Sequence, residues 1–173
     1  MEENEYVSPR NVGFKYGAIS GVVGILSTVL QDVLAMQQST VFQVAGIVVL
    51  LGLLFLAHRE YKSNGDGFMD YGQGVGIGFW FGLISSAISS LFLFVYVKFI
   101  STGFLDAIRE QQVIALEERG LSDAEIEQAL KMSEAFSGPT AMLIFGLVGG
   151  TLISVIAALI VSAFTKKARP EFE

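Results

Sequence analysis

The chain has 173 residues, of which 52% are hydrophobic and 16% are charged. An ordinary soluble domain carries about 25% charged residues, so the composition excludes a conventional soluble fold. The net charge of −6 argues against a nucleic-acid-binding protein, which would show a basic surface. The chain has no cysteine and a single histidine, which excludes disulfides and cysteine-ligated zinc. We therefore expect one integral membrane domain over residues 1–173.

Four apolar stretches are long enough to cross a bilayer. A helix that spans about 30 Å of hydrocarbon needs about 20 apolar residues. The stretches cover residues 14–34, 37–57, 71–97 and 139–165. None of them alternates apolar with polar residues, as the strands of a membrane barrel do. The sequence therefore predicts an all-α membrane protein with four transmembrane helices.

Lysine and arginine are distributed unequally between the segments that flank these spans. Seven lie before the first span, between the second and third, or after the fourth: Arg10, Lys15, Arg59, Lys62, Lys166, Lys167 and Arg169. The other four lie in residues 98–139. Cytoplasmic segments of membrane proteins are enriched in these residues, so we expect both termini in the cytoplasm.

The segment between the third and fourth spans differs from the rest of the chain. Residues 98–139 contain eight acidic and four basic residues, a net charge of −4. The pattern predicts an extramembrane helical hairpin over about residues 102–136. Gly120 suits the left-handed position that ends a helix, and Ser122 with Glu125 forms a capping box. The two helices either pack on the ends of the spans or recognise a partner outside the cytoplasm.

Small residues recur every four positions in three of the spans. They are Gly13, Gly17 and Gly21 in the first, Gly74, Gly78, Gly82, Ser86 and Ser90 in the third, and Gly146, Gly150, Ser154 and Ala158 in the fourth. Such stripes let transmembrane helices approach closely, so we expect helix packing, with the third and fourth spans as a tight pair. The alternative is that the stripes line a pore. Ionisable residues deep in the spans, which coupled carriers use, are missing.

The remaining polar residues suggest structural roles. Asp32 lies before a short connection that its carboxylate can cap. His58 lies where the second span ends, and we expect it to contact the last helical carbonyls. No residue set matches the spacing of a catalytic, cofactor or metal site, so we expect a protein that is not an enzyme and binds no cofactor.

Three segments carry a family resemblance: the run FMDYGQGVGIGFWFGLISSAISSLFLFVYVKFISTGFLDAI, the helix LSDAEIEQALKM and the final glycine-rich span. Together with KYGAISGVVGIL and HREYKSNGDG, they resemble the bacterial membrane proteins grouped as domain of unknown function 4199. Ser101, Thr102 and Gly103 stand where the family pattern has a proline. The resemblance implies a multi-pass protein of the bacterial inner membrane and brings no catalytic residues with it.

Two functions from different classes follow from these expectations. The first is a structural or accessory subunit that sits in the lipid bilayer and contacts a membrane or periplasmic protein through its acidic hairpin. The second is a small channel or transporter, assembled as a homo-oligomer, that uses the stripes of the third and fourth spans. Neither involves nucleic acid.

Overall fold

A computed structural model describes residues 7–101 and 103–169 of the chain, with the backbone alone for residues 134–137. Thr102 and the side chains of 134–137, at the two ends of the expected hairpin, lie outside this description. The elements in chain order are α1 (Pro9–Val33), α2 (Thr40–Asn64), α3 (Tyr71–Val95), the π-helical turn η1 (Tyr96–Ile100), α4 (Phe104–Glu118), α5 (Asp123–Ser137) and α6 (Pro139–Thr165). The described residues contain no strand.

Four helices are long and apolar enough to cross a membrane: α1, α2, α3 together with η1, and α6. The prediction of an all-α protein with four long apolar helices is confirmed. Each begins at a residue that suits a helix start. Ser8 accepts a hydrogen bond from the backbone of Asn11 at 3.1 Å and precedes Pro9 in α1. Asp70 forms a capping box with Gln73 at the start of α3, and α6 begins at Pro139.

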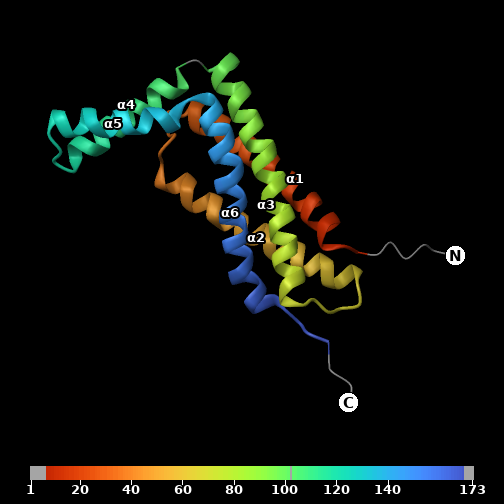
Figure 1. Ribbon diagram of the computed structural model, residues 1–173. Helices are drawn as coiled ribbons and strands as arrows, with labels where there is room; N and C mark the ends of the chain where they lie inside the picture. The colour runs from red at the N-terminus through yellow and green to blue at the C-terminus, as the bar shows by residue number, and fades with distance from the viewer. Residues whose placement is uncertain (1–6, 102, 170–173) are drawn as a thin grey trace.

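Helix α3 is the centre of the bundle, with α1 packed on one side and α6 on the other (Figure 1). Its Ile77 and Phe81 are fully buried. Helix α2 contributes its buried side chains from the C-terminal half alone, starting at Leu54. The outer faces of the long helices expose large apolar side chains such as Leu26 and Phe164, as expected of a lipid-facing surface.

The two ends of the bundle are different. The start of α1, the end of α6 and the α2–α3 loop lie at one end, while the α1–α2 loop and α4 with α5 lie at the other (Figure 1). Helices α4 and α5 extend sideways from the bundle in this view. Hereafter these two helices and the turn between them are called the α4–α5 segment.

Candidate functional site

The interface between α3 and α6 places glycines of each helix against small residues of the other. The facing pairs are Gly74 with Ser162, Gly78 with Ala158, Gly82 with Ser154, Gly150 with Ser86, and Gly146 with Ser90. A Cβ atom on Gly82 would lie 2.5 Å from the Cβ of Ser154, and one on Gly150 would lie 2.8 Å from the Cβ of Ser86. The two backbones are therefore so close that these positions admit no larger side chain.

Two serine hydroxyls of α3 are hydrogen-bonded inside this interface. Ser86 and Ser90 each donate to the carbonyl one turn earlier in α3. The Oγ atom of Ser86 also lies 3.0 Å from Oγ1 of Thr151 in α6. Within one copy of the chain, the stripes of α3 and α6 therefore face each other and not a water-filled path.

Helix α1 meets α3 through its own glycine stripe. A Cβ atom added to Gly13 would lie 2.7 Å from the Cβ of Trp80. One added to Gly17 would lie 2.6 Å from the carbonyl oxygen of Phe81, and one added to Gly21 would lie 2.8 Å from the Cβ of Ile88. Beside Gly21, Ser85 donates to Ser20 across the interface at 3.0 Å. The stripe of α1 thus contacts larger side chains of α3, whereas α6 contacts a second small-residue stripe.

His58 is buried inside the bundle, so the expectation that it caps the end of α2 is wrong. Its side chain is completely inaccessible, with Nδ1 2.8 Å from Oγ1 of Thr165 and Nε2 3.1 Å from the carbonyl oxygen of Gly74. Because a carbonyl only accepts, Nε2 donates to Gly74. The buried residues of α2 lie on one face of the helix: Leu54, Ala57, His58 and Tyr61. This helical spacing is visible in the sequence and could have predicted that His58 is buried.

Other polar groups join α6 to the α2–α3 loop beside His58. Lys62 donates to the Thr165 carbonyl at 2.8 Å. Met69 and Lys167 exchange two backbone hydrogen bonds of 3.0 and 2.9 Å. The hydroxyl of Ser162 is buried and has no hydrogen-bond partner in the described part of the chain. The end of α6 is therefore fixed to α2 and to the loop that follows it.

The opposite end of the bundle is joined by Asp32. Its carboxylate accepts hydrogen bonds from the Tyr96 hydroxyl at 2.7 Å and from Nε2 of Gln37 at 3.1 Å. Tyr96 begins η1 and packs between Phe92 and Phe104, with ring centroids 5.3 and 6.1 Å away. Asp32 therefore contacts its own connection through Gln37, as expected, and in addition joins the end of α1 to η1 through Tyr96.

The turn of the α4–α5 segment combines a left-handed glycine with a capping box. Gly120 has a φ of 79°, in the left-handed region that glycine favours. The carboxylate of Glu125 accepts hydrogen bonds from the backbone N–H and the hydroxyl of Ser122 at 2.8 and 2.7 Å. These bonds to the charged form hold the pKa of Glu125 below its ordinary value.

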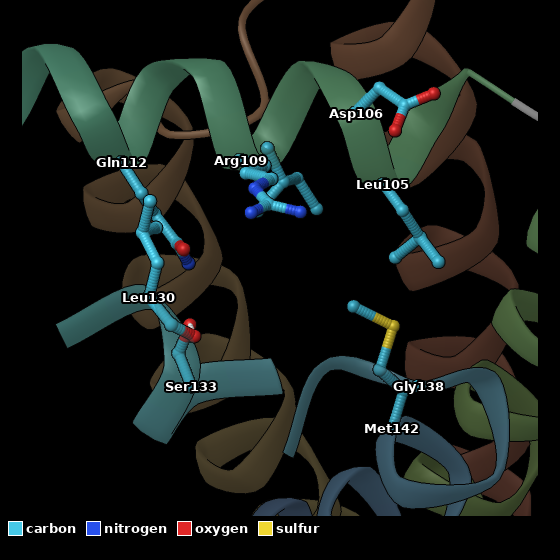
Figure 2. A pocket seen from close by; sticks show the side chains of 9 residues that line it. Leu105, Asp106, Arg109, Gln112, Leu130, Ser133, Gly138 and Met142 are labelled. Carbon is cyan, nitrogen blue, oxygen red and sulfur yellow. Dashed lines mark hydrogen bonds between the residues drawn. The ribbon is translucent and has the colours of Figure 1, made fainter. Parts of the chain in front are cut away.

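Helix α4 is tied to the α1–α2 loop by side-chain amides. Gln111 donates to the side-chain oxygen of Gln37 at 2.8 Å, and Gln38 donates to the carbonyl of Ile108 at 3.4 Å. A cavity of about 210 Å³ lies between α4, α5 and the start of α6. Figure 2 shows Arg109 of α4 and Met142 of α6 on opposite sides of it.

The comparison with protein families decides the classification of this chain. A family model described as protein of unknown function (DUF4199) matches residues 15–167. The chain belongs to the DUF4199 family. No curated protein and no solved structure matches it. The family assignment and the four apolar helices together indicate a multi-pass membrane protein.

Three polar features of this DUF4199 member remain as candidate sites: the buried His58 cluster, the Asp32 cluster and the α4–α5 cavity. Residues 7–101 and 103–169 contain no group of three or more His, Cys, Asp or Glu side chains that could hold a metal ion. Of the three features, the α4–α5 cavity alone combines open volume with charged side chains. It is also more enclosed than the hollow of about 300 Å³ beside Arg59 and Glu60, and is therefore the best candidate for binding.

Proposed function

We propose that this chain is a non-enzymatic structural or accessory protein of the bacterial inner membrane, whose acidic α4–α5 segment contacts a protein partner outside the cytoplasm. The observation that carries the proposal is a capped, anchored pair of helices with exposed acidic side chains, among them Glu110, Glu117, Glu118 and Glu127. The net charge of −4 over residues 98–139 suits a basic partner surface.

The orientation in the membrane is part of the proposal. Seven lysines and arginines lie near the start of α1, near the α2–α3 loop or just after α6, and they favour a cytoplasmic position for that end of the bundle. The chain has no cysteine, so Glu118→Cys and Lys166→Cys each create a single labelling site. In intact spheroplasts, a membrane-impermeant maleimide should label Glu118→Cys. It should label Lys166→Cys only after the membrane has been permeabilised. The reverse pattern would show that the α4–α5 segment is cytoplasmic.

Contact with a partner can be tested by photo-crosslinking in cells. A photoreactive amino acid in place of the exposed Gln128 should give a crosslink to a second protein. The double variant Glu117→Lys, Glu118→Lys, probed from the same position 128, should lose this crosslink because it reverses the charge of the segment. The charge-retaining control Glu117→Asp, Glu118→Asp should keep it. Equal crosslinking in all three chains would contradict an electrostatic contact at this surface.

A small oligomeric channel or transporter is the second candidate. The buried His58 favours it, because an ionisable residue inside a membrane bundle is a common element of proton-coupled transport. The stripes of α3 and α6 give it no support, because they are closed by mutual packing. Solute flux across proteoliposomes under a pH gradient, lost in His58→Gln and kept in a control at an exposed position, would favour this candidate over the first.

A further inference from the structure

The cavity beside α4 has walls of mixed chemistry. Its apolar walls include Leu105 and Ile108 of α4, Leu130 of α5 and Met142 of α6, while Asp106 and Arg109 of α4 supply one charge of each sign. Leu105 and Arg109 of α4 extend toward the side of the cavity that Met142 forms, whereas the carboxylate of Asp106 lies at its rim and is directed away from Met142 (Figure 2). The site therefore suits a ligand that has an apolar part and both a cationic and an anionic group.

The position of the cavity is at the boundary of the bilayer. Gly138, which lines it, directly precedes α6, a helix apolar enough to span the membrane. The hydrogen bonds from Gln37 and Gln38 hold α4 beside the loop that joins two other spans. Helix α4 therefore lies where three spans leave the hydrocarbon, which is the level of lipid phosphate and glycerol groups.

The size of the cavity limits what it can enclose. Its volume of about 210 Å³ is below the roughly 300–1,000 Å³ of pockets that enclose a drug-sized ligand. A lipid headgroup is small enough for it, whereas acyl chains must lie outside. The N-terminal half of α2 offers them an apolar surface, since Val44, Ile47 and Val48 are 54%, 56% and 63% exposed and a Cβ atom added at Gly46 would meet no other element within 4 Å.

We propose that this cavity binds the headgroup of an aminophospholipid, with the phosphate against Arg109 and the primary ammonium against Asp106. The guanidinium has five N–H donors, so it can contact a phosphate in addition to groups of the protein. The carboxylate of Asp106 gives the site a partner for an ammonium group, which a phosphoglycerol headgroup lacks. The net charge of −4 over residues 98–139 also disfavours a lipid with a net negative charge. The proposal does not depend on a protein partner.

Titration of the delipidated full-length protein with single lipids, read by native mass spectrometry, tests the proposal. Phosphatidylethanolamine and phosphatidylglycerol with identical acyl chains are the two probes. The wild type should prefer phosphatidylethanolamine, and Arg109→Gln should weaken its binding by about tenfold or more, as expected for loss of a charge-assisted hydrogen bond. Asp106→Asn should reduce the preference between the two lipids and keep phosphate-dependent binding.

Arg119→Gln is the matched control, because Arg119 is an exposed arginine at the C-terminal end of α4 and does not line the cavity. It should bind both lipids as the wild type does. If Arg109→Gln lowers the stability of the segment, Met142→Trp provides an independent test by filling the cavity from α6, and it should also weaken phosphatidylethanolamine binding. Equal affinity of the wild type for both lipids, or binding unchanged in Arg109→Gln and Met142→Trp, would overturn the proposal.

Discussion

The close packing of α3 against α6 predicts that adding a single methyl group at Gly82 destabilises the bundle. The new Cβ would lie 2.5 Å from Ser154 Cβ, 2.9 Å from its hydroxyl oxygen and 3.2 Å from the Thr151 Cα atom. The first two distances are shorter than real Cβ contacts, and the third involves backbone that cannot rotate away. Overpacking of this kind costs about 1–3 kcal/mol of unfolding free energy, and we expect Gly82→Ala to fall in that range.

The same substitution at Gly46 of α2 is the matched control, because a Cβ atom added there would meet no neighbouring element within 4 Å. Gly46→Ala should leave the unfolding free energy unchanged or raise it by up to about 1 kcal/mol, because alanine is the better helix former. The double variant Gly82→Ala, Ser154→Gly should recover part of the loss, because it removes both of the shortest contacts. This recovery would distinguish steric overlap from a general intolerance of α3 to substitution.

Unfolding can be followed in mixed micelles by the fluorescence of Trp80, which is the single tryptophan of the chain. Its ring lies in α3 and packs edge-on against Phe14 of α1 at 5.3 Å, so its emission reports separation of the helices. Equal stability of the Gly82→Ala and Gly46→Ala variants would refute the reasoning, because it would mean that α3 and α6 are not held at the described distance.

Three further predictions concern the buried histidine and the α4–α5 turn. His58→Leu should lower the unfolding free energy by about 1–3 kcal/mol in the same micelle assay, since it removes both hydrogen bonds of a fully buried side chain; equal stability would contradict its structural role. Gly120→Ala should lower the stability of the segment by about 1 kcal/mol because of the positive φ at this position. Gly103→Ala is the control and should not lower it, since Gly103 has a φ of −83°. Thermal loss of helical circular dichroism measures both. The hydrogen bonds from Ser122 lower the pKa of Glu125 in the folded protein. The carboxylate should therefore stabilise α5 above its ordinary pKa of 4.5, and this stabilisation should disappear as the pH falls through the lower folded pKa. If Glu125→Gln and the wild type lose helix content with the same pH profile, this prediction is contradicted.

The sequence predicts the long helices because the physical requirement is local. A run of about 20 apolar residues fixes a span whatever surrounds it, and the described α1, α2, α3 with η1, and α6 are such runs. The turn at Gly120 and Ser122 is equally local, because a left-handed residue and a capping box are completed within six residues. Rules of this range can be applied without knowing the tertiary structure.

The buried polar clusters depend on which helices meet, and the sequence does not contain that information in a local form. His58 lies near the end of an apolar run, but its partners Gly74 and Thr165 come from two other helices. The π-helical turn at Tyr96 has no proline or glycine to predict it. The Tyr96 hydroxyl bonds to Asp32, which is 64 residues away. The cavity likewise needs the relative placement of three helices.

Native mass spectrometry of the tagged full-length protein, isolated from its membrane in nanodiscs, tests the proposed function most directly. The account predicts a second protein in fixed stoichiometry with the wild type and with the Glu117→Asp, Glu118→Asp control. It predicts the loss of that protein from the Glu117→Lys, Glu118→Lys variant. A monomer or homo-oligomer without a second protein would contradict an accessory role, and a homo-oligomer would direct attention to flux through the assembly.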